Sequence, residues 1–494
     1  MKQRILLGAE YSILEPLALF YLASIAKSEG LEQKIIMGNY PEYPEWKEAI
    51  DKFNPSLMGL TVYTGNHTKI AEFVKKIRAE KPDLKIITGG PHATYFPKQS
   101  LEFSDYVVVG EGFNSFRRII RGESPPGILL PQTREPFPSS FREDFYKDSP
   151  KHLRNRIKNV ILGTGCPFNC SHCYNSADIK DMEDFNEIDI KNLKKIYPSG
   201  RFFPPFQRSI KEVINEIEEL QKISSETKFL FLEDDIFGMD LKWLRQFSKE
   251  YHARIPYHAN MRFEFVDPEK DSGKERIDLL IESGCTGLSF AIECSDPVIC
   301  KETLGRNHNE DLIFRVMHAM KNAGLKVRTY QMIGLPYGAT TKPTKINLEA
   351  DLNTLSLNVR LIKETGLPTF VWASTLAPYP GTKISDYCIK HGFYNGIFDN
   401  LSGNETYRIR SVLSHVKRWI GPELSPADYD VWLSHEEQEE YRDKLSSLMN
   451  YFPVLAMIPK GDELARKFLN QKDLSSAGLN KACRTFVYDN SLFV

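Results

Sequence analysis

The chain has 494 residues, a length that at roughly 100–200 residues per domain corresponds to about three domains. Hydrophobic residues make up 41% of it and charged residues 26%, which is typical of globular proteins and excludes wholesale disorder or a fibrous structure. The 64 Lys and Arg residues balance the 65 Asp and Glu residues, so no bulk positive charge favours binding to nucleic acid. No apolar run approaches the length of a bilayer span, and we expect a cytoplasmic protein without a transmembrane segment.

Residues 1–130 alternate short apolar runs with segments of helical periodicity. In residues 69–80 the apolar residues recur about every 3.6 positions, and residues 16–29 are predicted to be helical because they begin with Pro16 and end before Gly30. The apolar runs predict five strands: Arg4–Leu7, Lys34–Met37, Leu57–Val62, Lys85–Thr88 and Tyr106–Val109. Strands that alternate with helices predict a doubly wound parallel sheet of the Rossmann-like type, which binds ligands at the carboxyl ends of its strands.

Glycines and polar residues stand where three of these strands end. The candidate ligand contacts there are Thr61, Gly89, Gly90, Gly110 and Glu111. Because glycine has no Cβ, the backbone can approach a ligand closely at these positions. The alternative is that the glycines only form tight turns.

Residues 131–155 are rich in Pro, Ser and charged residues, and we expect them to link two domains. A second alternation of strands and helices fills residues 156–395. Its predicted strands are Val160–Gly163, Phe229–Leu232, Tyr257–Met261, Gly287–Ile292, Lys326–Ile333 and Phe370–Leu376. Six repeats predict a partial (βα)6 TIM-like barrel. Residues 174–206 are expected to form a partly helical cap, and residues 396–494 a helical C-terminal domain.

Three of the eight cysteines lie in one eight-residue segment directly after the first barrel strand: Cys166, Cys170 and Cys173. Soft thiolates bind zinc, copper(I) or iron–sulfur clusters. A structural zinc site normally has four protein ligands, no second C-x2-C pair exists, and His172 is poorly placed as a fourth ligand. Three ligands leave one metal position open, which suits a 4Fe–4S cluster, while zinc remains the alternative. The scattered cysteines are expected to be buried apolar residues: Cys285, Cys294, Cys300, Cys388 and Cys483.

The C-x3-C-x2-C segment resembles the signature of the radical S-adenosylmethionine (SAM) superfamily, although His172 stands where that family usually has an aromatic residue. Later segments resemble further motifs of the family in the same order, and they contribute Glu233, Asp234, Asp235, Arg262, Glu293 and Ser295. The resemblance implies that the acidic segment after strand two contacts the amino group of SAM. It also implies that the glutamate of strand four binds the ribose hydroxyls.

Each of these assignments has a structural alternative. Asp234 and Asp235 could cap the N-terminus of a helix. Glu293 could form a structural salt bridge, and Arg262 could pair with Glu264 instead of a ligand.

Residues 1–130 resemble the cobalamin-binding domain that precedes the radical SAM barrel in one branch of the superfamily. Thr61 and Gly89 are 28 residues apart, which fits the spacing of the corresponding motifs in cobalamin-binding domains. The Asp-x-His-x-x-Gly loop that supplies a cobalt ligand in some of them is absent. We expect His92 to cap a turn or to face solvent rather than to replace that ligand. The first 165 residues contain no cysteine, which argues against a methylthiotransferase.

The resemblance implies an enzyme that uses a 4Fe–4S cluster, SAM and, in this branch, cobalamin. Its implied activity is methylation of an unactivated carbon of a small-molecule or lipid substrate, with a reducing partner such as flavodoxin or ferredoxin. Two alternatives are a cyclase or rearrangement enzyme with the same cofactors, and a non-catalytic cobalamin sensor. No residue is assigned a catalytic role from the sequence.

Overall fold

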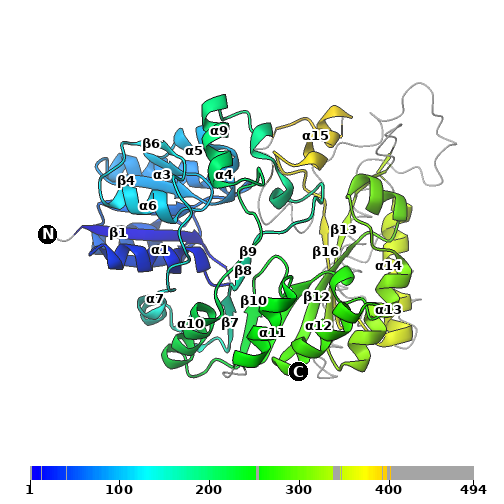
Figure 1. Cartoon of the computed structure of the whole chain (residues 1–494). Coiled ribbons are helices and arrows are strands. Elements are labelled where there is room, and N and C mark those ends of the chain that lie inside the picture. Colours follow the sequence, from blue (N-terminus) through cyan, green and yellow to red (C-terminus); the bar gives the residue numbers. More distant parts are fainter. Residues whose placement is uncertain are drawn as a thin grey trace, which may run out of the picture. The chain divides into compact units, whose positions relative to one another are not determined.

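The structure is a computed structural model, and it describes residues 3–12, 14–40, 42–251, 255–337, 345–346, 348–391, 393–397 and 401. The chain divides into two compact units, whose elements can be followed in Figure 1. Unit 1 consists of Met1–Phe168, Tyr174–Phe237 and Arg245–Tyr257, and unit 2 of Asn169–Cys173, Gly238–Leu244 and His258–Val494.

Unit 1 contains a six-stranded parallel sheet with the strand order β2-β1-β3-β4-β5-β6. Its strands are β1 (Arg4–Glu10), β2 (Glu32–Gly38), β3 (Leu57–Thr61), β4 (Lys85–Gly89), β5 (Tyr106–Val108) and β6 (Gly127–Leu129). The five predicted strands are confirmed, whereas the three-residue edge strand β6 was not predicted. The strand order reverses between β1 and β3, and this is the point at which doubly wound sheets bind their ligands.

Helices connect these strands, because their apolar residues recur at helical spacing and need the sheet to cover them. They are α1 (Leu17–Ser28), α2 (Tyr43–Phe53), α3 (His67–Glu80), α4 (Pro91–Tyr95), α5 (Pro97–Leu101) and α6 (Phe113–Ile120). Trp46 of α2 is fully buried between two glycines. A Cβ on Gly8 would lie 2.8 Å from the Trp46 ring, and one on Gly38 would lie 2.9 Å from it. The core of this domain therefore depends on glycine at both positions.

The predicted linker contains two short helices, α7 (Glu143–Asp148) and α8 (Pro150–Arg154). The segment 174–206 follows it as a partly helical insertion, as predicted. This insertion contains the 3-10 turns η1 (Tyr174–Ser176) and η2 (Ile179–Asp181) and helix α9 (Glu187–Ile196). Its apolar side chains share a core with Tyr95 and Val109 of the first sheet domain.

The second sheet has the strand order β16-β13-β12-β11-β10-β7. Its strands are β7 (Ile157–Val160), β10 (Phe229–Leu232), β11 (Tyr257–Met261), β12 (Cys285–Glu293), β13 (Lys326–Ile333) and β16 (Phe370–Thr375). The six predicted strands are confirmed, and they follow one another in chain order as a partial (βα)6 barrel requires. The short pairs are β8 (Gly163–Thr164) with β9 (Phe206–Gln207), and β14 (Pro336–Tyr337) with β15 (Lys345–Ile346).

Helices follow most strands of the second sheet: α10 (Ile210–Ile223), α11 (Leu241–Glu250), α12 (Asp271–Glu282), α13 (Glu310–Asn322), α14 (Leu348–Thr365) and α15 (Lys383–Lys390), with the shorter η3 (Phe263–Phe265) and the π-helical η4 (Ile299–Thr303). Ser209 and Glu212 form a capping box that begins α10.

The predicted helical domain at 396–494 lies outside the described residues, apart from 396, 397 and 401. Within the described part of the chain, none of the helices has the length and apolar character needed to cross a bilayer.

Candidate functional site

A cavity of about 330 Å³ lies at the carboxyl end of the first sheet in unit 1. All five ligand contacts predicted for this domain line it: Thr61, Gly89, Gly90, Gly110 and Glu111. The insertion and the first barrel strands contribute further lining residues, among them Ile161, Thr164, Phe202 and Phe203. The structure therefore brings these predicted residues together around one cavity.

Backbone geometry explains two of the glycines on this cavity. Gly90 has a φ of +99°, and a Cβ there would lie 2.8 Å from the Val62 carbonyl oxygen. Gly110 has a φ of +69°, and a Cβ there would lie 3.1 Å from the Phe202 ring. Both positions require glycine for their conformation, and both leave bare backbone on the cavity wall. The conformational role of these two glycines is thus shown, whereas their contact with a ligand stays a prediction.

The cavity wall is mostly apolar and contains one ion pair. Arg134 Nε lies 3.0 Å from a carboxylate oxygen of Glu111. Burial raises the pKa of Glu111, and the guanidinium of Arg134 acts against that shift. Because these two charges already compensate each other, the cavity suits a large ligand that is bound mainly by shape and by its apolar surface.

The acidic residues after β10 hold the backbone that leads to the cysteine segment. Asp234 Oδ1 accepts a hydrogen bond from the Leu162 amide at 2.7 Å, and Asp235 Oδ2 accepts one from the Gly165 amide at 2.7 Å. Asp235 also accepts a bond from Asn175 Nδ2 at 2.8 Å. Neither aspartate caps a helix, so that alternative is wrong. Asp240 provides the cap of α11 instead.

Asp234 and Asp235 differ in burial. Asp234 is 1% exposed, and this burial raises its pKa to about 7, although the backbone amides of Leu162 and Gly163 act to lower it. Asp235 is exposed. Of the two, Asp235 is therefore the one available to a cationic ligand group, whereas Asp234 is committed to the backbone.

The start of the cysteine segment has a second support, which the sequence did not reveal. Arg201 donates hydrogen bonds to the carbonyl oxygens of Cys166 at 3.2 Å and Phe168 at 3.1 Å. Gly165 has a φ of +81°, and a Cβ on it would lie 2.3 Å from the Pro204 carbonyl oxygen. The insertion thus packs directly on the backbone before Cys166.

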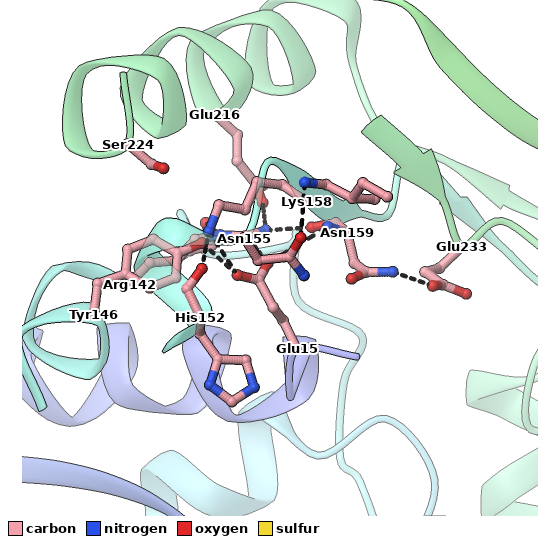
Figure 2. Close-up of polar contacts among 12 residues, drawn as sticks. Glu15, Arg142, Tyr146, His152, Asn155, Lys158, Asn159, Glu216, Ser224 and Glu233 are labelled. Atoms are coloured by element: carbon pink, nitrogen blue, oxygen red, sulfur yellow. Dashed lines mark hydrogen bonds and ion pairs between the residues drawn. The ribbon is translucent and has the colours of Figure 1, made fainter. Parts of the chain in front are cut away.

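A buried ion network in unit 1 holds β7, the strand before this segment (Figure 2). Glu15 accepts from Arg142 Nη1 at 2.7 Å and from the Tyr146 hydroxyl at 2.6 Å. Arg142 also donates to the backbone carbonyl oxygen of Asn159 at 2.9 Å, and the side-chain amide of Asn159 donates to Glu233. Glu233, one of the predicted SAM contacts, is thus linked through β7 to the loop before α1.

Unit 2 contains the second part of the cysteine segment, and cationic groups face it. Arg262 Nη1 lies 3.6 Å from Cys170 Sγ, and Arg306 Nη1 lies 3.9 Å from the same sulfur. Arg262 also pairs with both carboxylate oxygens of Glu264, at 3.2 and 2.6 Å, as the structural alternative stated. Ser171 is fixed by its amide, which donates to the Leu304 carbonyl oxygen at 3.1 Å.

Glu293 lies at the end of β12 in an unusual conformation. It is 8% exposed and has a φ of +61°, which is rare for a residue with a side chain. His172 Nε2 lies 3.4 Å from one of its oxygens and Arg306 Nη1 lies 3.6 Å from the same oxygen. Burial acts to raise the pKa of Glu293, but the hydrogen bond from His172 and the neighbouring cations lower it. Glu293 is therefore ionised and can accept hydrogen bonds. The ion pairs that were expected as the structural alternative are present around it.

Ser295 and the described scattered cysteines also lie in unit 2. The Ser295 amide donates to the Thr354 hydroxyl at 2.9 Å. The scattered cysteines within the described residues are buried, as predicted: Cys285, Cys294, Cys300 and Cys388. Cys483 lies outside the described residues.

The donor chemistry of the cysteine segment fits a metal-bound thiolate, because two guanidinium groups face Cys170. A sulfur bound to a metal carries negative charge, which these two cations would complement. Within the described residues, no group of three His, Cys, Asp or Glu side chains is gathered closely enough to hold a metal ion. The three-cysteine ligand set thus stays a prediction of the sequence.

One part of the expectation for His92 is wrong. His92 does not face solvent, because it is 1% exposed and its Nδ1 is hydrogen-bonded to the Thr64 hydroxyl at 3.0 Å. Sequence reasoning also missed Arg201 and Arg306. Neither stands at a fixed spacing from a motif, and Arg201 lies in the insertion, where no periodicity marked it.

Comparisons with known proteins agree with this arrangement. Residues 3–120 match the B12 binding domain family, and residues 160–338 match the radical SAM superfamily. The chain joins a B12-binding domain to a radical SAM domain. These two domains imply a 4Fe–4S cluster, SAM and cobalamin as cofactors.

Two relatives and a solved structure match most of the chain. An uncharacterized methyltransferase of Pyrococcus horikoshii, PH0819, is 24% identical over 76% of this chain and 78% of its own. The cytidylyl-2-hydroxyethylphosphonate methyltransferase of Streptomyces wedmorensis is 19% identical over 83% and 84%. The structure of the radical SAM methyltransferase TsrM of Kitasatospora setae, with cobalamin and a 4Fe–4S cluster bound, has a TM-score of 0.57 at 16% identity over 99% and 100% of the chains. The chain is thus similar to cobalamin-dependent radical SAM methyltransferases.

Proposed function

We propose that this protein is a cobalamin-dependent radical SAM enzyme that methylates an unactivated carbon of a small-molecule or lipid substrate. The observation that carries the proposal is the pairing of two features in one chain. One is the glycine-lined cavity of the B12-binding domain, and the other is the three-cysteine segment with its supporting charges. The methyltransferase names of the relatives favour methylation over the other outcomes known for this combination of domains.

In this proposal each group of residues has a separate task. Cys166, Cys170 and Cys173 bind the cluster, and Glu293 accepts the ribose hydroxyls of SAM as an ionised carboxylate. Asp235, the exposed aspartate after β10, faces the positive end of SAM. When bound, the cluster and SAM supply a 5′-deoxyadenosyl radical and cobalamin supplies a methyl group.

The glycines around the cavity leave room for the corrin of cobalamin. Gly89, Gly90 and Gly110 expose backbone where side chains would otherwise project. A one-electron reductant, a flavodoxin or ferredoxin in our proposal, would reduce the cluster. The remaining task of the chain is to exclude water and oxygen.

The test uses two products that do not require the substrate to be known. Anaerobically reconstituted protein with cobalamin, SAM and a reductant is expected to form both 5′-deoxyadenosine and S-adenosylhomocysteine. The first product reports reductive cleavage of SAM and the second reports transfer of its methyl group. The triple variant C166A/C170A/C173A is expected to lose bound iron and 5′-deoxyadenosine formation.

The same measurement separates the alternatives. A cyclase or rearrangement enzyme would form 5′-deoxyadenosine without S-adenosylhomocysteine. A cobalamin sensor would bind cobalamin but contain no iron. If the triple variant kept its iron and its turnover, the assignment of the cysteine segment would be wrong.

A further inference from the structure

Tyr174 follows Cys173 directly in the chain, and residues of the B12-binding domain hold it. The Tyr95 hydroxyl donates to the Tyr174 carbonyl oxygen at 2.9 Å, and the two rings stack with centroids 4.7 Å apart. The Tyr174 hydroxyl is hydrogen-bonded to the Thr64 hydroxyl at 3.2 Å. Both the backbone and the side chain of Tyr174 are therefore fixed, and because Cys173 is joined to it covalently, the positions open to Cys173 are restricted.

The contact continues into the B12-binding domain. The Thr64 hydroxyl is also hydrogen-bonded to His92 Nδ1 at 3.0 Å, and the His92 ring stacks on His67 with centroids 4.2 Å apart. Thr64, His67 and His92 are each at most 4% exposed. His92 lies in the short helix α4, which begins after Gly90 on the cavity wall. A chain of hydrogen bonds, buried at Thr64 and His92 and partly buried at Tyr174, thus joins Tyr174 to the loop that lines the cavity.

The same domain also holds the chain before the cysteine segment. Glu15 binds Arg142, which donates to the Asn159 carbonyl oxygen of β7. Asn159 stands seven positions before Cys166 and Tyr174 one position after Cys173. The B12-binding domain is therefore attached to the chain on either side of the cysteines.

We propose that Tyr174, together with Thr64 and His92, is a positioning residue that couples the cobalamin cavity to the cysteine segment. Cobalamin, by ordering the Gly89–Gly90 loop, would order His92, Thr64 and Tyr174 in turn and so limit the movement of the segment. This inference rests on the proposed function. Tyr174 is the first residue of the insertion, and neither the sequence motifs nor the relatives indicate this role for it.

The test is hydrogen exchange, measured by mass spectrometry on peptides that cover residues 162–178 of the full chain with its cluster reconstituted. In the wild-type protein, added cobalamin is expected to slow exchange in these peptides. In Tyr174→Phe, exchange is expected to be about fivefold faster, the factor expected for one lost hydrogen bond, and insensitive to cobalamin. In Thr64→Val, which also loses the hydrogen bond to His92, exchange is expected to be at least as fast and equally insensitive to cobalamin. The matched control is Tyr63→Phe, because the Tyr63 hydroxyl donates to Glu10 and takes no part in the chain.

The two single variants also check each other if one of them folds poorly. The double variant T64V/Y174F is expected to exchange no faster than Thr64→Val alone, because Thr64→Val already removes the hydrogen bond between Thr64 and Tyr174. Wild-type exchange rates in Tyr174→Phe, or fully additive effects in the double variant, would overturn the inference. A wild-type protein that binds no cobalamin or no iron would refute the proposed function, whereas the comparison of wild type with Tyr174→Phe would still decide the role of Tyr174.

Discussion

The cavity of the B12-binding domain and the charged cluster around Glu293 are built in opposite ways. The cavity is lined by apolar side chains and bare glycine backbone, with one internally compensated ion pair between Glu111 and Arg134. The cluster around Glu293 instead gathers His172 and Arg306 around a buried carboxylate. The first is suited to a large ligand held by shape, and the second to a small polar ligand held by a few strong hydrogen bonds.

This difference teaches where single substitutions act. In a cavity that works by shape, added volume excludes the ligand, while the loss of one polar group changes little. In a charged cluster the loss of one charge leaves its buried partners uncompensated, and the cost is paid whether or not a ligand is bound.

The largest effect is expected from added volume at Gly89. A Cβ there would meet only Val108, at 3.8 Å, and the φ of Gly89 is not positive, so a side chain fits the backbone but projects along the cavity wall. Gly89→Leu is expected to abolish cobalamin binding, measured by absorbance after anaerobic reconstitution, while Gly89→Ala retains most of it. Full cobalamin binding by Gly89→Leu would show that the ligand does not occupy this cavity.

A smaller effect is expected when the charge of Glu293 is removed. Glu293→Gln keeps the shape of the side chain but loses its charge-assisted hydrogen bonds, so SAM should bind about 10–100-fold more weakly. Equilibrium dialysis with labelled SAM on cluster-loaded protein measures this. Glu310→Gln is the matched control, because Glu310 forms an exposed pair with Arg360. Equal SAM affinity in the two variants would remove Glu293 from the site.

The last effect concerns stability instead of ligand binding, and it is a pH dependence caused by Asp234. Its pKa is raised to about 7 by burial, from an ordinary value of 3.8, so the folded chain keeps this proton up to a higher pH than the unfolded chain. The free energy of unfolding should therefore fall between about pH 4 and pH 7, by an amount on the order of a few kcal/mol, and stay level above that range. Asp234→Asn should lack this fall. Denaturant unfolding of both proteins at several pH values measures the difference, and parallel curves would contradict the assignment.

Most of the fold could be predicted because the strands are short segments in which apolar residues either follow one another or alternate with polar ones. Phe229–Leu232, Tyr257–Met261 and Lys326–Ile333 have the same bounds in the structure as in the prediction. The edge strand β6 was not predicted, because three residues in a stretch rich in Pro and Gly show no hydrophobic periodicity. The segment 131–155 was predicted as a linker from its composition, and its buried Arg142 could not have been foreseen.

The residues of the candidate site could likewise be predicted only where local spacing marks them. Cys166, Cys170 and Cys173 stand in one short segment, and the glycines stand at strand ends, so local spacing was enough to find them. Arg306 could not be found in that way, because only the folded chain brings it to within 3.9 Å of Cys170 Sγ, which lies 136 positions away.

The sequence by itself determined most of the strands, the glycines that follow several of them and where the three cysteines stand, because each of these depends on neighbours within a few positions. Only the tertiary structure decided what supports these residues. Glu15 and Arg142 pair across 127 positions, and Thr64 reaches Tyr174 across 110. Contacts of this kind depend on how distant segments pack, and no periodicity or spacing in a single sequence specifies them.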